Sequence, residues 1–390
     1  MAYTVFLQTP DAPIREELSW TTDLATSYDG SEDRIPLNRY PKRIFSGTYS
    51  FDDVSAARRH MASMFRLNQG EFDFPLFQYM VKLKNSVSAG SNTVSVNSLR
   101  SDFRVGRKAV ISDGSKYEIR TVASVAANSV TFTSNLANGF GKQAYLCPVT
   151  SAYTAAGAAF NRMNPDGTAS ASFTYSESDK WTPFLSHLNT STVDTFDSKP
   201  VLDIRAKGNQ FDMSLTTGIS ITDYIGPADV FSPWLQSQWT MNLVWHCNRT
   251  FDLSSWLWWM AFADQVQGSF KPFLLPTQRS DLEVVDPAVG AGNAVTVEGS
   301  EYSQHYFSLD TFKRIVIDSD AGRHYALVTG ISSVSGNDRL TFSPALPNTI
   351  GWTVNQRVEF MLKVHIADDK ILIDHYDLYS DIAMSVRTVS

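Results

Sequence analysis

Hydrophobic and polar residues alternate over several short stretches of the chain, which is the pattern of half-buried β-strands. The clearest stretch runs from Trp239 to His246, where Trp239, Met241, Leu243 and Trp245 alternate with more polar neighbours. A weaker one runs from Arg43 to Tyr49, interrupted by Gly47. Similar patterns predict further strands over Thr168–Tyr175, Val201–Ala206, Gln210–Ile221, Glu359–Ile366 and Lys370–Tyr379.

Two stretches have the periodicity of a helix instead. After Asp52 or Asp53, either of which can cap a helix, one apolar stripe contains Val54, Ala57, Met61, Met64 and Phe65. Asp252 can cap a second helix over Leu253–Ala263, which is apolar nearly all round. A helix of that kind is buried on more than one side, so we expect it between sheets or at a subunit contact.

The same series of features occurs twice along the chain. Phe51-Asp52 and Phe251-Asp252 each open a helical stretch, and these stretches end at Gly70 and Gly268. Each is followed by β-rich segments that match in order, beginning at Gly90 and at Gly292. Similarity between two β-rich segments can arise by chance, but the shared order at nearly constant offset favours an old internal duplication.

Within each copy, a turn-rich segment predicts a small inserted β-domain. Asp113-Gly114 lies between two strand-like stretches and is a strong hairpin signal. Asp318-Ser319-Asp320-Ala321-Gly322 has the corresponding place in the second copy. Several short strands separated by turns suggest a compact barrel, of the OB or SH3-like kind, or a small sandwich.

The predicted fold class is therefore mainly β with one short helix per unit (α+β), built from two tandem β-sandwich units. We expect the first unit to span residues 1–82 and 143–195, and its insert 83–142. The second unit is expected over 196–280 and 358–390, and its insert over 281–357. The Ser/Thr/Asp/Pro-rich stretch Thr190–Pro200 is the predicted linker.

Composition narrows the functional classes. The chain has 390 residues, 43% of them hydrophobic, and a formal net charge of −7, so a basic nucleic-acid-binding surface is not expected. Two cysteines, Cys147 and Cys247, cannot form a disulfide framework or a four-cysteine zinc site. We see no apolar run long enough to span a membrane and no signal peptide.

Candidate catalytic and metal-binding groups are few. The chain has no nucleophile elbow, phosphate loop or zinc-protease motif, and Gly290-Ala291-Gly292 is read as a loop. His246 and Cys247 are adjacent, but neighbours in a strand point to opposite faces. The remaining acidic groupings are better explained as hairpins than as calcium, metal or acid–base sites: Asp318-x-Asp320-x-Gly322, Asp368-Asp369 and Asp374-His375-x-Asp377.

We therefore predict no catalytic, cofactor-binding or metal-binding residues, no cofactor and no enzymatic activity. A glycosidase using paired carboxylates is the enzymatic alternative, but pairs can always be chosen from 40 acidic residues. Without a perturbed pair in a pocket, that alternative has no specific support.

The order strand, capped helix, Phe-x-x-Pro segment, β-insert and return strands resembles a family of structural proteins. The resemblance lies in Phe51–Leu76 with Tyr145–Val149, and in Trp239–Pro276 with Val358–His365. It is to the distal tail (Dit) and tail-tube-hub-like proteins of long-tailed, siphovirus-type bacteriophages. Such proteins form rings around the tail channel, and two units in one chain depart from the usual single-unit distal tail protein.

The resemblance implies a component of the tail tip or baseplate that links the tail tube to the hub or fibres. Three duplicated chains could fill six equivalent positions, so a trimeric ring is favoured over a hexameric one. Implied partners are the tail tube, hub and tail fibre proteins, with the tape-measure protein as a further candidate. DNA would be met only in transit, without membrane insertion, in a virion protein made in the host cytoplasm.

An alternative function remains open at this stage. The inserted β-domains could bind carbohydrate or a receptor, and an exposed aromatic platform on one of them would support this. The distal tail and hub roles are also not distinguished by the residues alone.

Overall fold

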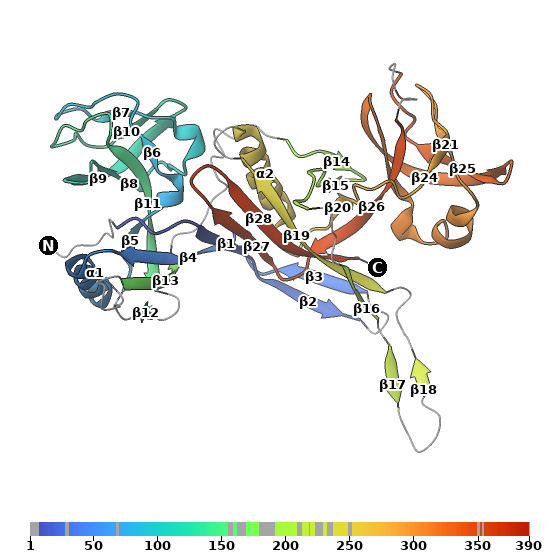
Figure 1. Ribbon diagram of the computed structural model, residues 1–390, viewed down its shortest axis with the longest axis horizontal. Helices are drawn as coiled ribbons and strands as arrows, with labels where there is room; N and C mark the ends of the chain where they lie inside the picture. The colour runs from blue at the N-terminus through green and yellow to red at the C-terminus, as the bar shows by residue number, and fades with distance from the viewer. Residues whose placement is uncertain are drawn as a thin grey trace.

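The computed structural model is a mainly β structure with two long α-helices in its described part (Figure 1). It describes residues 8–27, 31–67, 70–154, 159–161, 169–178, 192–208, 213–217, 219–222, 229–231, 237–248, 252–348, 352 and 355–389. The elongated molecule has a central sheet, and a small group of β-strands stands at each end on the same side of that sheet.

The central sheet is antiparallel and crosses both halves of the chain. Its eight strands are, in order, β12 (Ala159–Asn161), β13 (Ala169–Glu177), β4 (Lys42–Phe51), β1 (Ile14–Ser19), β27 (Lys370–His375), β28 (Ser380–Thr388), β19 (Gln238–Cys247) and β16 (Met213–Thr216). The strand β1 pairs with β4 on one side and with β27 on the other, so it joins the two halves.

In the first half, α1 (Val54–Leu67) and the strands β5 (Phe72–Pro75) and β11 (Tyr145–Thr154) pack on the inner face of this sheet. Phe74 of β5 lies against Phe45 of β4, with ring centroids 5.6 Å apart, and against Phe173 of β13 at 5.8 Å. Asp53 caps α1, because its carboxylate accepts hydrogen bonds from the backbone N–H groups of Ser55 and Ala56.

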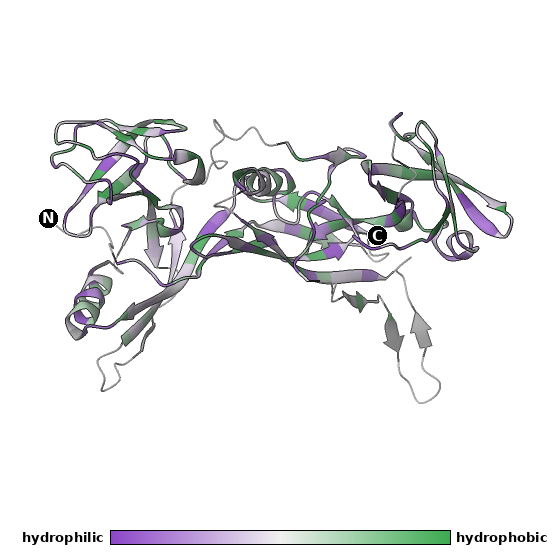
Figure 2. Cartoon of the chain, turned by 45° about the horizontal axis from the view of Figure 1, so that its top comes forward, coloured by the Kyte–Doolittle hydropathy of each residue, from purple (hydrophilic) through white to green (hydrophobic). Residues whose placement is uncertain are grey.

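The second half has matching elements in α2 (Leu253–Val266), β20 (Phe273–Pro276) and β26 (Arg357–Ile366). Asp252 caps α2 by accepting from the Ser255 N–H at 3.1 Å. α2 has many more buried hydrophobic residues than α1, which carries several charged ones (Figure 2). The two helices differ because Arg58 and Arg59 of α1 are exposed, while Leu257 and Met260 of α2 are buried.

Each half also carries a small β-group at its end of the molecule (Figure 1). The first contains β6 (Val81–Lys82), β7 (Thr93–Ser95), β8 (Lys108–Ser112), β9 (Tyr117–Ala126) and β10 (Ser129–Phe132), with 3-10 turns at Phe77–Tyr79 and Ser98–Arg100. The second contains β21 (Val284–Asp286), β22 (Ala294–Val297), β23 (Arg314–Ser319), β24 (Gly322–Val334) and β25 (Asn337–Ser343), with a π-helix at Tyr302–Tyr306 and a 3-10 turn at Asp310–Phe312.

These groups are attached through strands that continue into the body of each half. Along β11, one end pairs with β8, the middle with β5 and the far end with β13. Along β26, the same order recurs with β23, β20 and β28. A continuous strand shared by both parts leaves no free joint, so each β-group is held rigidly on its half.

The pairings agree in detail between the halves, including an irregularity. In the pair β9–β10 the register shifts between Thr131 and Phe132, and in β24–β25 it shifts between Val328 and Gly330, opposite Phe342 and Thr341. In both pairs the residue just past the shift on the shorter strand is a buried phenylalanine, Phe132 or Phe342. A β-bulge at the same place changes the direction of the strand in the same way in both halves.

Two hairpins extend from the central sheet. The strands β2 (Thr22–Thr26) and β3 (Glu32–Pro36) follow β1, and β17 (Ser220–Thr222) and β18 (Asp229–Phe231) follow β16. Each hairpin lies in the chain between two strands that pair with each other, β1 with β4 and β16 with β19, and β17–β18 projects on the side away from the β-groups (Figure 1).

Most of the predicted elements are present. The helices and the strands predicted around Arg43, Thr168, Trp239 and Glu359 are confirmed as α1, α2, β4, β13, β19 and β26, and the Asp113-Gly114 and Asp318–Gly322 hairpins join β8 to β9 and β23 to β24. Thr168 itself, Gln210–Asp212 and Gly218 lie outside the described residues. Within Gln210–Ile221, β16 and β17 are separate strands.

One predicted strand was wrong, a second was confirmed only in part, and one helix was missed. Val201–Ala206 is not a strand: Val201 forms a single bridge to Leu274, and the Leu202 N–H donates to Leu274 O. Of the strand predicted over Lys370–Tyr379, Lys370–His375 is confirmed as β27, and the rest is a turn closed from Tyr376 N–H to Tyr379 O before β28. The prediction of one helix per unit omitted the π-helix at Tyr302–Tyr306. The linker over Thr190–Pro200 stays a prediction, and its described part contains a hairpin of β14 (Thr195–Phe196) and β15 (Lys199–Pro200).

Gly268, just after α2, supports a testable prediction about stability. Its φ is +67°, and an added Cβ would lie 2.7 Å from Asp369 Oδ1 and 2.8 Å from Trp20 Cβ. We expect Gly268→Ala to reduce the free energy of unfolding by about 1–3 kcal/mol, because left-handed strain and a clash combine. Chemical denaturation measures the change. The control is Gly70→Ala, where an added Cβ meets nothing within 4 Å and at most a small change is expected.

His60 predicts a specific pH dependence. It lies on the buried side of α1 against Tyr49 and Phe51, and burial lowers its pKa to about 4. The unfolded state therefore binds the extra proton more readily, and stability is lost as the pH falls from about 6.5 towards 4. In His60→Leu we expect this loss to shrink by up to about 3 kcal/mol, as measured by urea unfolding across that range. An identical pH slope in both proteins would show that His60 does not contribute.

Candidate functional site

The solvent-facing side of the central sheet is polar and rich in small hydroxyl residues. In each strand, alternate residues point into the core and out to solvent, as in any antiparallel sheet with one wet face. The outward positions of β4, β13, β19 and β28 include Ser46, Thr48, Ser50, Ser170, Ser172, Thr174, Thr240, Asn242 and Ser385. The described side chains on this face are therefore mainly hydrophilic in both halves, with apolar positions such as Ile44, Val244 and Leu372 among them.

Charges on this polar face are neutralised by neighbours. Arg15 Nε lies 2.7 Å from Asp374 Oδ1, directly across the β1–β27 pair. Lys370 Nζ lies 3.0 Å from Glu17 Oε1 on the same two strands. Pairing of opposite charges leaves the surface hydrophilic without a strong field of one sign.

Asp381 is the centre of a third neutralised group on this face. Lys207 Nζ lies 2.8 Å from Asp381 Oδ2, and His246 Nδ1 lies 2.9 Å from Oδ1. Partial burial opposes ionisation of Asp381, but the hydrogen bonds from Lys207 and His246 outweigh it and lower its pKa. The carboxylate is therefore ionised and satisfied at neutral pH.

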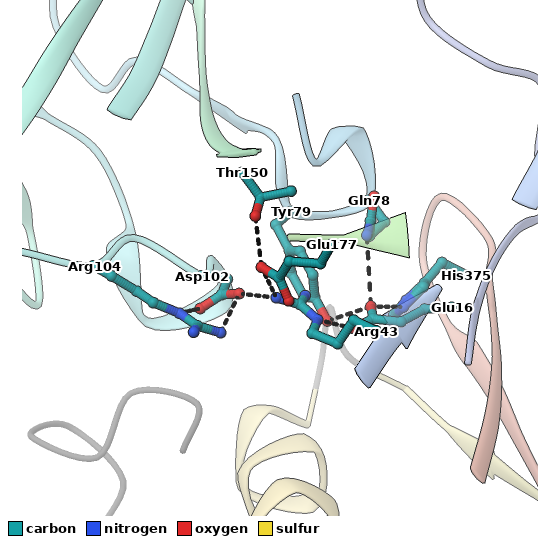
Figure 3. Close-up of polar contacts among 9 residues, drawn as sticks. All are labelled: Glu16, Arg43, Gln78, Tyr79, Asp102, Arg104, Thr150, Glu177 and His375. Carbon is teal, nitrogen blue, oxygen red and sulfur yellow. Dashed lines mark hydrogen bonds and ion pairs between the residues drawn. The ribbon is translucent and has the colours of Figure 1, made fainter. Parts of the chain in front are cut away.

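A buried ionic cluster lies under the same sheet at the boundary between the halves (Figure 3). Arg43 of β4, with only 1% of its surface exposed, donates from Nε to Glu16 Oε1 at 2.7 Å and from Nη1 to Asp102 Oδ2 at 2.8 Å. Its Nη1 also lies 3.5 Å from Glu177 Oε1. One guanidinium thus connects β1, β4, β13 and the first β-group.

Glu16 extends the cluster into the second half. Its Oε2 accepts a hydrogen bond from Tyr79 Oη at 2.8 Å and lies 3.0 Å from His375 Nε2 of β27. His375 Nδ1 lies 3.0 Å from Ser380 Oγ at the start of β28. The boundary is therefore fixed by directional contacts as well as by the β1–β27 backbone ladder.

The protonation tendencies of the cluster follow from its charges. Burial opposes ionisation of Glu16, but the Arg43 guanidinium and the His375 hydrogen bond hold the pKa of Glu16 well below its usual range. Burial raises the pKa of Glu177, against the attraction of Arg43. Glu16 is thus a firmly ionised partner of Arg43, and Glu177 takes up a proton more readily than an exposed glutamate.

Asp369 joins three segments in the turn between β26 and β27. Its carboxylate accepts hydrogen bonds from the backbone and hydroxyl of Thr22 and from the backbone and hydroxyl of Ser269. A carboxylate that accepts this many hydrogen bonds from protein groups has a structural role, because it fixes the segments that donate them. We assign Asp369 to positioning β2 and the end of α2 around the turn.

The other residues weighed from the sequence do not gather into a site. His246 is exposed and Cys247 is buried, on opposite faces of β19. Asp318 pairs with Arg323 and Arg357 beside the β23–β24 hairpin. Asp374 faces solvent and His375 the core. Across the described ranges, no three His, Cys, Asp or Glu residues lie close enough to hold a metal ion.

The sequence reasoning missed the Glu16–Arg43 cluster, although a signal was present. In Ile14–Ser19 the buried positions are Ile14, Glu16 and Leu18, so a glutamate occupies a core position in an alternating pattern. Arg43 likewise occupies the inward register of β4. Two opposite charges at core positions of neighbouring strands predict a buried pair, but only once the strands are known to be neighbours.

An apolar groove lies beside β16 and β19 at the outer side of the second half. It consists of two adjoining cavities of about 170 and 280 Å³, which share Trp239 and Phe312. Leu215, Leu309 and Tyr306 contribute further apolar surface. The two cavities together form a mainly apolar recess at this end of the second half.

Comparison with known proteins does not assign the chain to a family. No protein-family model matches it, and neither does any curated protein. Among the described helices, none is both long and apolar enough to cross a membrane. Functional interpretation therefore depends on the polar sheet face, the buried cluster and the apolar groove.

The buried cluster predicts an asymmetric response to two similar substitutions. Arg43→Met would remove the buried guanidinium from Glu16 and leave Asp102 with Arg104 as its remaining cation, and we expect a loss of about 3–5 kcal/mol in unfolding free energy. Arg15→Met removes an exposed partner of Asp374, and we expect a change of about 0–1 kcal/mol. Denaturant unfolding of both variants measures the contrast. Equal effects would mean that Arg43 does not hold the two halves together.

Proposed function

We propose that the chain is a structural ring component of the tail tip or baseplate of a long-tailed bacteriophage. In this role it surrounds the tail channel and links the tail tube to the hub or fibres. The observation that carries the proposal is the eight-stranded antiparallel sheet, which has one polar face and runs across both halves.

The repeated pairings support an internal duplication. Strand orders β13–β4–β1 and β28–β19–β16 are the same, and both halves place a capped 14-residue helix after the long strand. We assign the first unit to 1–82 and 143–195 with insert 83–142, and the second to 196–280 and 358–390 with insert 281–357. Each unit contributes four strands to the central sheet, in a sandwich-like arrangement with its helix.

The two ends of the sheet favour closure into a ring. Within the described part of the chain, β12 pairs with β13 alone and β16 with β19 alone, so each has an unpaired edge. Because the sheet has an even number of alternating strands, β16 of one copy is antiparallel to β12 of the next. A closed barrel of roughly 16 or more strands has a water-filled channel. Two or more copies of the eight-stranded sheet would supply that number of strands.

The polar face suits the wall of such a channel. Its hydroxyl groups and paired charges attract neither a hydrophobic partner nor a polyanion strongly. DNA in transit would therefore pass without being held. The two inserts stand on the other side of the sheet (Figures 1 and 2), where they can meet neighbouring fibre or hub proteins.

The inserts give little support to a carbohydrate-binding role. Sugar platforms depend on exposed aromatic rings, whereas every described Trp, Phe and Tyr side chain of both inserts is buried or half-buried. The ring role, in the virion tail tip and after synthesis in the host cytoplasm, is the one that the geometry favours.

The state of assembly tests the proposal. A duplicated chain that fills two of six positions is expected to form a closed trimer, with a hexamer as the alternative closed state. Mass photometry and negative-stain microscopy of the purified protein should show rings with an open centre. A protein that remains monomeric at its highest soluble concentration would contradict the proposed function.

A further inference from the structure

The junction inside the chain has a counterpart on the free side of the second unit. Across the β4–β1 pair, Arg43 lies opposite Leu18, and across the β19–β16 pair, Trp239 lies opposite Leu215. The positions correspond, because β4–β13 and β19–β28 have matching registers. The apolar groove at Trp239 is therefore where the second unit would carry its own junction.

The two positions differ in what covers them. Leu18 is 1% exposed, because β27 lies beside β1 with Ile371 directly opposite Leu18. Leu215 is 59% exposed, and the described residues place no strand along the outer edge of β16. An exposed leucine beside an apolar groove at the end of a sheet marks a surface built for association.

The helix of the second unit completes the cover of the internal junction. Trp256 of α2 lies near Tyr79 of the first unit, with ring centroids 6.3 Å apart, and near His375 at 5.7 Å. The matching helix of the first unit, α1, stands beside β12 and β13 at the opposite end of the sheet (Figure 1). A second copy could thus offer α1 and β12 to the groove as α2 and β27 are offered inside the chain.

We propose that the outer edge of β16 and the groove around Trp239, Leu215 and Phe312 bind the β12 edge and α1 of a second copy of this chain. The inference rests on the proposed ring and specifies its contact between copies. Both edge strands are short, with three and four residues, so backbone pairing alone would be weak. Burial of the apolar groove supplies the remaining stabilisation.

The two kinds of junction would then differ in chemistry. The one inside the chain contains the buried ions Arg43 and Glu16, whereas the one between copies is lined by Trp239 and Phe312. An ion cluster is satisfied as soon as the chain folds, but a solvent-exposed apolar groove can remain open until a partner arrives. Assembly between folded copies therefore uses the apolar version.

The internal junction also predicts the register between copies. Glu16 lies opposite both Phe45 and Ile373. Met213 of β16, which lies opposite Met241, is the residue that corresponds to Glu16 of β1. Phe160 of β12, which lies opposite Ala171, is the residue that corresponds to Ile373 of β27. The contact should therefore place Met213 opposite Phe160 and, one residue along, Ser214 opposite Ala159.

Disulfide trapping tests this register. We expect Ser214→Cys mixed with Ala159→Cys to give a linked dimer under mild oxidation, because directly opposed residues have the Cα spacing of a disulfide. Cys147 and Cys247 are buried and do not compete. Asn161→Cys mixed with Ser214→Cys is two residues out of register, and its dimer band should be lost.

The single variants provide a symmetry control. A head-to-tail contact brings different surfaces together, so Ser214→Cys alone and Ala159→Cys alone should give no linked dimer. Dimers from either variant alone would reveal a two-fold contact and overturn the proposal. Absence of a dimer in the mixture, when the native protein forms rings, would overturn the proposed contact and leave the ring function standing.

A charge in the groove supplies an independent test. Leu215→Glu should abolish the ring and leave a folded monomer, whereas Val105→Glu, an exposed apolar residue of the first insert, should leave it intact. Mass photometry measures assembly, and circular dichroism verifies the fold. Rings that persist in Leu215→Glu would overturn the contact, while a native protein that never assembles would contradict the proposed function itself.

Discussion

The structure depends on the double pairing of β1. This six-residue strand forms ladders with β4 on one side and with β27 on the other, although β27 lies some 350 residues later in the chain. Without β1, the two halves would each end in a four-stranded or smaller sheet and would not share one surface. Because its inward side carries Glu16, the same strand also places the buried charge that Arg43, Tyr79 and His375 satisfy.

Two properties follow from the double pairing of β1: the junction between the halves is rigid, and the corresponding place on the second half is left uncovered. The junction between the halves is closed by a ladder, an ionic cluster and the contact of Trp256 with Tyr79. The corresponding place at the far side has the same strand geometry, but it has an apolar groove and no covering strand in the described residues. A chain with one satisfied and one open version of the same junction is suited to adding copies of itself in one direction.

Sequence patterns predicted the local elements well and their neighbours poorly. Alternation identified β4 and β19, and capping residues identified both helices within a few positions. Val201–Ala206 misled, because Val201 and Leu202 are buried although the segment forms only one bridge, from Val201 to Leu274. The Glu16–Arg43 pair was not predicted, since local periodicity does not reveal that β1 and β4 are neighbours or that β1 also pairs with β27. Long-range pairing carries that information, and a single sequence does not display it.

The central claim is that the polar sheet face lines a closed channel and that the sheet continues from one copy to the next. A cryo-electron microscopy map of the assembled protein tests both statements at once. We predict a closed ring in which β16 of each copy pairs with β12 of its neighbour and the face that carries Thr240 and Ser172 points inward. A ring whose inner wall is formed by the inserts, or in which β12 and β16 do not meet, would contradict the account.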